Sequence, residues 1–121
     1  MQWDLSNAYE RLGNLHLARK DAAAARDAFQ QSLDLTLRLV KLDPHNRRLQ
    51  KDLAISYDKL SRAYPLLGDT DATRAAIQAA IDIREPLARD DPGDAELQRY
   101  LRRDRARLNA LATQAAPAGP R

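Results

Sequence analysis

The chain has 121 residues, of which 31% are charged and 5% aromatic, and its net charge is +3. This length suffices for one domain with a hydrophobic core, and the many Ala, Leu and Arg residues favour packed helices over sheets. The chain contains no cysteine, which excludes a disulfide framework and thiol chemistry. It shows no apolar run of membrane-spanning length and no signal-peptide core, so we expect a soluble, cytoplasmic protein.

Apolar residues at helical spacing predict a first helix over residues 3–19 and a second over residues 22–42. Lys20 and Asp21 form the predicted turn between them, with Asp21 as the N-cap of the second helix. The second helix is apolar around most of its circumference, which indicates that it is covered on more than one side. Its main apolar stripe consists of Ala25, Ala28, Phe29, Leu33, Leu37 and Val40.

Asp43 and Pro44 interrupt the helical pattern, because proline disfavours helical geometry at the residue before it. The next helix is predicted over residues 45–67, with Asp43 as its cap and Pro44 at its start. Pro65 lies in the last turn of this stretch and predicts a kink. Gly68 follows, and it can adopt the left-handed conformation that ends a helix.

The second half of the chain repeats this arrangement. A fourth helix is predicted over residues 70–89, with a kink at Pro86. A second break at Pro92 separates it from a fifth helix over residues 93–115. Residues 116–121 are predicted to form a flexible tail.

A gapless shift of 48 residues superimposes the second helical pair on the first. The matches include Asp4 with Asp52, Leu5 with Leu53, Tyr9 with Tyr57, Leu12 with Leu60, Ala28 with Ala76 and Pro44 with Pro92. A fixed period of this kind indicates a repeat architecture. We interpret residues 1–115 as one domain, with repeat one over 1–43, repeat two over 44–91 and a terminal helix over 92–115. The first repeat begins about one helical turn late, so we expect the chain to be cut from a longer array.

The order of residues within the period resembles that of the tetratricopeptide repeat (TPR). In copy one the resemblance is carried by Tyr9, Leu12, Gly13, Ala25, Phe29 and Pro44. In copy two it is carried by Tyr57, Leu60, Tyr64, Ile77, Ala80 and Pro92. The resemblance implies an all-α, right-handed helical-repeat solenoid of two long antiparallel helix pairs plus a C-terminal fifth helix.

The period is longer than the family's roughly 34 residues. The excess is about 7 residues per helix, close to two full turns, so each helix lengthens without rotating its faces. This long variant resembles the extended repeats of multidomain bacterial signalling proteins. The register also predicts that Gly13 lies opposite Ala25 where two helices approach closely, and that an apolar end with Leu5 and Tyr9 promotes self-association.

The residues that could carry chemistry show no catalytic or metal-binding pattern. His16 and His45 lie in different elements, so a zinc site would need distant carboxylates; we interpret His16 as packed and His45 as a surface residue. The acidic run from Asp90 to Glu96 lacks the spacing of a calcium-binding loop and fits helix capping instead. The serines have no Gly-rich elbow, and no phosphate loop or dinucleotide fingerprint is present. We therefore expect no enzyme activity and no cofactor.

The TPR resemblance implies that the first helix of each pair lines a concave groove that binds a peptide or a partner protein. Carried over by register, the groove positions are Asn7, Glu10, Asn14, Leu17, Ile55, Asp58, Lys59, Arg62, Arg103 and Arg107. Some TPR proteins clamp a C-terminal carboxylate here with basic and Asn residues, a pattern that Asn14, Arg103 and Arg107 match. Glu10 and Lys59 depart from it, and a solvated groove without a clamp is the alternative.

The sequence thus predicts a non-catalytic scaffold for protein–protein interaction. Arg103 and Arg107 are one helical turn apart and could bind a carboxylate, so we expect a partner that is acidic or has a free C-terminus. One alternative is a regulatory segment of a larger bacterial signalling protein whose catalytic domain lies elsewhere. A weaker alternative is a basic helical array that binds nucleic acid through the arginines of residues 99–107.

Overall fold

The computed structural model describes the backbone of residues 2–115 and the side chains of residues 4–113. Its elements are α1 (Gln2–Ala18), α2 (Ala22–Leu42), α3 (Arg47–Ala63), the 3-10 helix η1 (Tyr64–Leu67), α4 (Thr70–Asp90) and α5 (Ala95–Ala115). The predicted all-α class is confirmed, since residues 2–115 contain no strand. Within that range no helix is both long enough and apolar enough to cross a membrane. The predicted tail, residues 116–121, lies outside the described part.

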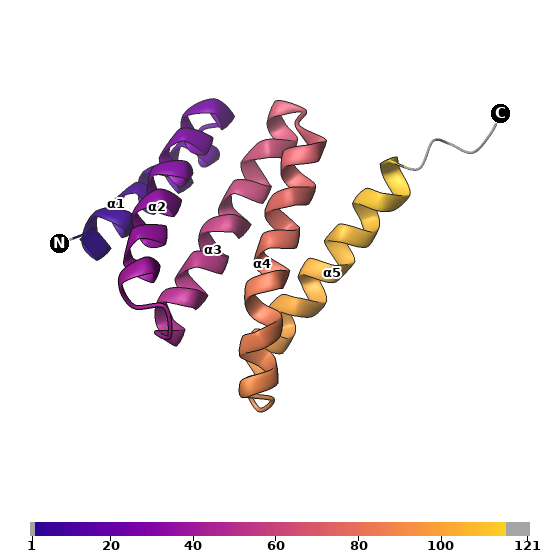
Figure 1. Ribbon diagram of the computed structural model, residues 1–121. Coiled ribbons are helices and arrows are strands. Elements are labelled where there is room, and N and C mark those ends of the chain that lie inside the picture. Colours follow the sequence, from indigo (N-terminus) through magenta and orange to yellow (C-terminus); the bar gives the residue numbers. More distant parts are fainter. Residues whose placement is uncertain (1, 116–121) are drawn as a thin grey trace.

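The helices stand side by side in chain order, and each runs opposite to the one before it (Figure 1). Each helix packs against the next one along the chain, and α1 also touches α3. The two hairpins α1–α2 and α3–α4 therefore lie next to each other, and α5 covers the far side of α4 (Figure 1). This arrangement brings α3, α4 and α5 together around the polar network described below.

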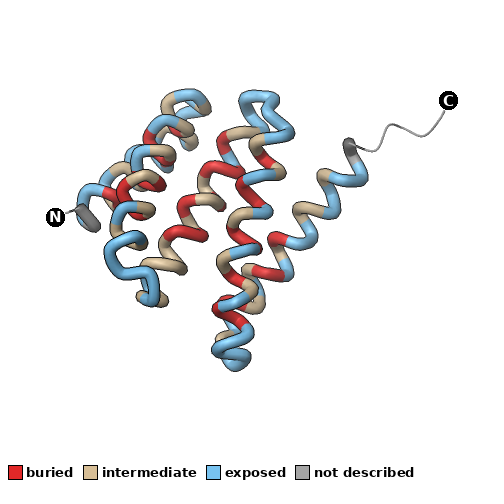
Figure 2. Tube along the Cα trace, viewed as in Figure 1, coloured by how far each residue is buried: buried red, intermediate tan, exposed pale blue. Residues whose placement is uncertain are grey.

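Buried residues form stripes on the facing sides of the helices (Figure 2). One cluster, centred on α2 and α3, contains Ala25, Phe29, Leu33, Leu53, Leu60, Ala63 and Ala76. A second, between α4 and α5, contains Ile77, Ile81, Leu87, Ala88, Leu97 and Leu101. The predicted apolar stripe of α2 is confirmed, because its first members are buried and the others, Leu37 and Val40, pack against the first cluster.

The two hairpin turns are built as the sequence predicted. Asp21 caps α2 by accepting a hydrogen bond from the Ala24 backbone N–H at 3.1 Å. Asp69 caps α4 in the same way, accepting from the Ala72 N–H at 3.0 Å. Gly68 has a φ of 73°, which confirms the predicted left-handed end of the preceding helix.

The start of α3 differs from the prediction. Asn46, not Asp43, caps this helix, with its side-chain oxygen accepting from the Leu49 N–H at 3.1 Å. Asp43 instead ends α2, because its own backbone N–H binds the carbonyl oxygens of Leu39 at 3.0 Å and Val40 at 3.2 Å. Aspartate and asparagine are both good N-caps. Because the backbone of Asp43 is bonded to the last turn of α2, Asn46 caps α3 instead. Likewise α5 starts later than predicted, with Asp94 as its cap.

Pro65 ends α3 rather than kinking it. The α-helix stops at Ala63, and Tyr64–Leu67 continues as the 3-10 helix η1. A proline has no N–H, so Pro65 cannot donate the helical bond to the carbonyl of Ser61, four residues earlier. That carbonyl is therefore free to accept another donor. At Pro86, by contrast, α4 continues to Asp90.

Gly13 marks a close approach of α1 and α2. A Cβ atom placed on Gly13 would collide with the Cδ1 and Cε1 atoms of the Phe29 ring and lie 3.0 Å from its Cζ. The predicted close approach is confirmed, but the nearest atoms belong to Phe29 rather than to Ala25. The buried aromatic ring thus occupies the space that the absent side chain leaves.

Three hydroxyl groups join α1 to α2 in the interior of the first hairpin. The Ser6 hydroxyl lies 3.0 Å from the Ser32 hydroxyl and 2.8 Å from that of Thr36, and it donates to the Ser32 carbonyl at 3.0 Å. All three residues are buried. The cluster satisfies the polar groups where the two helices meet.

Asp94 makes the stability of the second half depend on pH. Its carboxylate accepts from Lys51 Nζ at 2.8 Å and from the Leu97 N–H at 3.1 Å. These two hydrogen bonds hold the pKa of Asp94 below its ordinary value. The stabilisation is therefore present above the pKa of an unfolded aspartate, about 3.9, and is lost as the pH falls through the lower folded value.

We expect Asp94→Asn, which keeps an N-cap oxygen but loses the charge, to flatten the fall in melting temperature below about pH 4. Thermal unfolding followed by circular dichroism between acidic and neutral pH measures this. Asp90→Asn is the control, because Asp90 is exposed at the end of α4. Parallel pH profiles for the wild type and Asp94→Asn would contradict the assignment.

Candidate functional site

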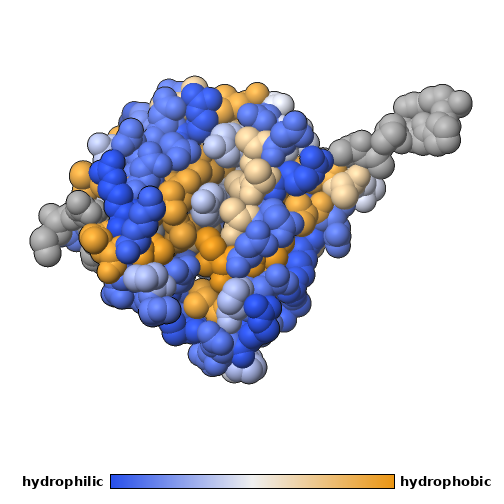
Figure 3. Space-filling view, in the orientation of Figure 1, coloured by the Kyte–Doolittle hydropathy of each residue, from blue (hydrophilic) through white to orange (hydrophobic). Residues whose placement is uncertain are grey.

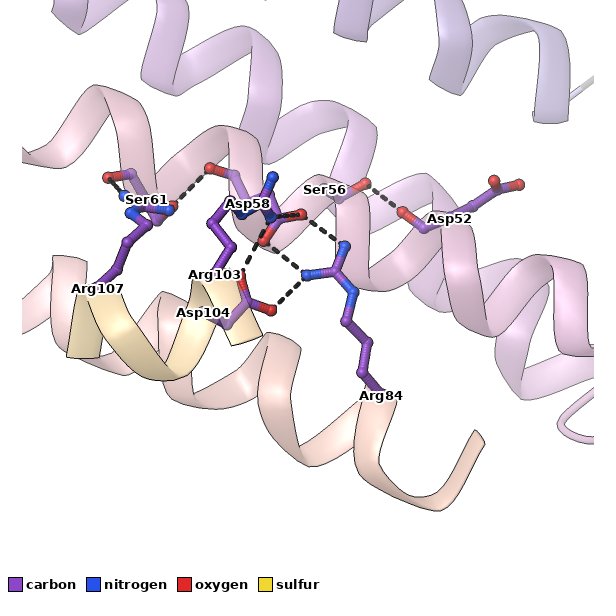
Figure 4. A network of polar contacts seen from close by, with 8 residues as sticks. All are labelled: Asp52, Ser56, Asp58, Ser61, Arg84, Arg103, Asp104 and Arg107. Carbon is purple, nitrogen blue, oxygen red and sulfur yellow. Dashed lines mark hydrogen bonds and ion pairs between the residues drawn. The ribbon is translucent and has the colours of Figure 1, made fainter. Parts of the chain in front are cut away.

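A buried network of charged side chains joins α3, α4 and α5 (Figure 4). Arg84 extends from α4 and donates to both carboxylate oxygens of Asp58 on α3, with Nη1–Oδ1 at 2.9 Å and Nη2–Oδ2 at 2.6 Å. Its Nη1 also donates to Oδ2 of Asp104 on α5 at 2.6 Å. The exposed fractions are 2% for Arg84, 5% for Asp58 and 0% for Asp104. The planar fork of one guanidinium thus holds carboxylates from two other helices.

Arg103 completes the network from α5. Its Nη2 donates to Oδ2 of Asp58 at 2.9 Å and to Oδ1 of Asp104 at 3.1 Å. Two guanidinium groups therefore face two carboxylates, and the charges cancel within the network. Asp58 and Arg103 were predicted to meet a ligand in the groove, but the structure uses both to connect helices.

Tyr100 packs its ring against the two arginines. The Cζ atom of Arg84 lies 4.4 Å from the ring centroid, and that of Arg103 lies 4.8 Å from it. Burial by itself would lower the pKa of Arg84, but the hydrogen bonds and charges of Asp58 and Asp104 outweigh it and raise that pKa above its ordinary value. Arg84 therefore stays charged in the interior.

Arg107 lies next to this network but differs from it in its partners. Its Nη1 donates to the Ser61 hydroxyl at 2.8 Å and its Nη2 to the Ser61 carbonyl at 3.1 Å, the carbonyl left free by Pro65 (Figure 4). Burial, together with the positive charges of Arg103 and Arg62, lowers the pKa of Arg107. Within the described part of the chain, its hydrogen bonds reach only neutral oxygen atoms.

The predicted groove residues all lie on α1, α3 and α5, and they differ in exposure. Asn14 and Arg62 are exposed and Asp58 is buried. The half-buried ones are Asn7, Glu10, Leu17, Ile55, Lys59, Arg103 and Arg107. Leu17 packs against the first core cluster, so it supports the fold. Among the groove arginines, Arg103 donates to two carboxylates, whereas Arg62 and Arg107 form no hydrogen bond to a carboxylate of residues 4–113.

A hollow that the sequence did not predict lies on the opposite face of α3. It has a volume of about 350 Å³ and is lined by Gln30, Leu33, Tyr57, Leu60, Tyr64, Ala72, Ala75, Ala76 and Ala79. Figure 3 shows apolar surface among hydrophilic surface on this side of the molecule, between α2 and α4. Each residue of α3 that lines the hollow lies two positions after a residue of the predicted groove. Residues two apart on a helix point in different directions, so the hollow and the groove use different faces of α3.

A second open hollow lies between the start of α3 and the end of α4. Its volume is about 770 Å³, and its lining includes His45, Arg47, Asp82, Asp90 and Asp91. His45 is exposed there, as predicted, whereas His16 is half-buried on α1. Within residues 4–113 no group of three or more His or carboxylate side chains is placed to hold a metal ion.

Sequence reasoning missed Arg84 and Tyr100 as members of the polar network. A signal for Arg84 was present, since it lies at helical spacing in the buried stripe Ile77, Ile81 and Ala88 of α4. A charged residue in such a stripe needs buried partners. The spacing does not say which partners these are.

The chain was compared with known proteins. A scan of protein-family models finds none that matches it, and no curated protein sequence matches it significantly.

Proposed function

We propose that the chain is a non-catalytic protein-binding scaffold with a TPR-like, right-handed solenoid of helices. Two features support the solenoid: each helix packs against its sequence neighbour, and α1 also touches α3, the first helix of the next pair. Several pairs of residues related by the 48-residue period are buried alike, for example Phe29 with Ile77 and Leu53 with Leu101. This likeness is expected when each repeat buries the same face against its neighbour.

Arg107 gives the main support for the binding proposal, through its burial and its hydrogen-bond partners. Its guanidinium is half-buried and is bound to a hydroxyl and a carbonyl, while Arg62 and Arg103 add positive charge beside it. A carboxylate that approached from solvent would offset both the burial and the repulsion, and it could accept strong, charge-assisted hydrogen bonds. We therefore propose that a partner binds with an acidic side chain or a free C-terminus beside Arg107 and Arg62.

The residues proposed to bind the carboxylate differ from those that the sequence predicts. Arg103 already binds two carboxylates of its own chain, so Arg107 and the exposed Arg62 replace the pair Arg103 and Arg107 as the residues that contact the ligand. Asn14 on α1 and Lys59 on α3 remain polar groove positions that the peptide would meet. Together they would contact more of the peptide backbone.

The test begins with a library of random peptides that have free C-termini, from which binders are selected. We expect Arg107→Ala and Arg62→Ala each to weaken the binding of a selected peptide about 10- to 100-fold, the usual worth of a hydrogen bond to a charged group. Amidation of the peptide's C-terminus, or neutralisation of its acidic residues, should have a similar effect. Fluorescence anisotropy at constant salt gives the affinities.

The matched control is Arg102→Ala, which removes the same charge from an exposed position of the same helix. It should leave binding nearly unchanged. An equal loss from Arg102→Ala and Arg107→Ala would mean that the partner senses general basicity, as in the nucleic-acid alternative. A salt-dependent gel shift with single-stranded DNA would then be the next measurement.

A further inference from the structure

The outer face of α1 carries an apolar stripe that no other described helix covers. Leu5, Leu12 and Leu15 have exposed fractions of 47%, 42% and 46%, and Ala8 is exposed between them. The successive spacings of three, four and three residues place the four side chains on one face of the helix. Large apolar side chains gathered in this way mark a surface that another molecule covers.

The same positions are buried one repeat later. A shift of 48 residues takes the stripe to Leu53, Ser56, Leu60 and Ala63 of α3, whose exposed fractions are 6%, 3%, 2% and 0%. Leu53, Leu60 and Ala63 belong to the cluster that includes Phe29 and Leu33 of α2. In α3 this face is thus a helix–helix contact, and in α1 its counterpart faces solvent.

The spacing of the stripe is symmetric about residue 10. Leu5 and Leu15 lie five residues to either side of it, and Ala8 and Leu12 lie two residues to either side. If two α1 helices pack antiparallel about a two-fold axis that passes beside residue 10, Leu5 of one meets Leu15 of the other and Ala8 meets Leu12. Each pair forms twice, as an isologous interface requires.

Charges at the two ends of the stripe fit the same arrangement. Asp4 lies at the beginning of α1, whereas Arg19 and Lys20 follow its end. In an antiparallel pair the acidic end of one α1 lies within about one turn of the basic end of the other. A parallel pair would bring like charges together, which disfavours that orientation.

We infer that a second copy of this chain binds here, with the two α1 helices packed antiparallel through Leu5, Ala8, Leu12 and Leu15. The apolar positions, their symmetry and the end charges all fit this occupant. The interface is small, so the dimer is weak and forms at high concentration. This inference is independent of the groove that faces the proposed peptide partner.

Cysteine cross-linking tests the orientation directly, because the chain has no cysteine of its own. Positions 5 and 15 are about 15 Å apart along one helix, too far for a disulfide within the chain. In the antiparallel dimer they are adjacent across the interface. We expect the double variant Leu5→Cys/Leu15→Cys to form a covalent dimer in a glutathione buffer several-fold more than either single variant. Efficient cross-linking of the single variants would indicate a parallel pair and overturn the inference.

Sedimentation equilibrium tests the association itself. We expect the average mass of the wild type to rise well above the monomer mass at about 0.5 mM chain, and Leu12→Glu to remain monomeric. The control is Leu66→Glu, an exposed leucine of η1 with an exposed fraction of 62%, which should dimerise like the wild type. A monomeric wild type at this concentration would overturn the inference and leave the stripe to a different protein. Circular dichroism of each variant checks that the helices are intact.

Discussion

Replacing Arg84 by alanine is expected to lower the free energy of unfolding by about 3–5 kcal/mol, the usual cost of removing one partner of a buried ion pair. The variant would leave Asp58 and Asp104 buried with Arg103 as their remaining cation in the network. Buried carboxylates without sufficient partners are strongly disfavoured. Urea unfolding followed by circular dichroism measures the loss.

A double-mutant cycle separates the network from simple loss of packing. Asp104→Ala alone should also destabilise, but the double variant Arg84→Ala/Asp104→Ala should lose clearly less than the sum of the two. The control is Arg105→Ala, which breaks the partly exposed ion pair with Glu85 and should change stability by at most about 1 kcal/mol. Additive losses in the cycle would show that Arg84 and Asp104 are not coupled.

The second large effect is expected at Gly13. Gly13→Leu should destabilise the protein by about 1–3 kcal/mol, because the new side chain would collide with the ring of Phe29 in a closely packed contact. The collision outweighs the better helix propensity of leucine, about 1 kcal/mol relative to glycine. Thermal and urea unfolding give the change in stability.

Two further variants show whether the ring of Phe29 is the cause. Gly93→Ala should be nearly neutral, because the nearest atom to a Cβ there is Asp91 Oδ1 at an ordinary 3.8 Å. Gly13→Leu combined with Phe29→Leu should be less destabilised than the sum of the single variants, since the smaller side chain makes room. An unchanged melting temperature for Gly13→Leu would reject the close approach of α1 and α2.

The elements that the sequence predicted well depend on signals within a few residues. Asp21 precedes a helical run and Gly68 ends one, and each acts through its own backbone neighbours. The start of α3 was misplaced because Asp43 and Asn46 are both good caps. The bonds of Asp43 to the last turn of α2 decide the matter, and they involve the geometry of the preceding helix.

The polar network could be predicted only in part, because its bonds join residues far apart in the chain. Arg84 meets Asp58 across 26 residues and Asp104 across 20 residues. Helical spacing can show that a charged residue lies in a buried stripe, but it does not select the partner from another helix. The same limit applies to Arg103, because its place on α5 does not reveal that Asp58, 45 residues earlier in the chain, accepts a hydrogen bond from it.

The two hairpins fill matching positions with different polar chemistry. Ser6, Ser32 and Thr36 of the first correspond by the 48-residue shift to Ala54, Ala80 and Arg84 of the second. A chain shuffled to carry the first hairpin twice would place a threonine where Asp104 needs a guanidinium. In a chain that carried the second hairpin twice, the copied arginine would face Ser56. By the 48-residue shift, Ser56 of α3 corresponds to Asp104 of α5. The buried polar contacts between helices therefore match only when the two hairpins are joined in their present order.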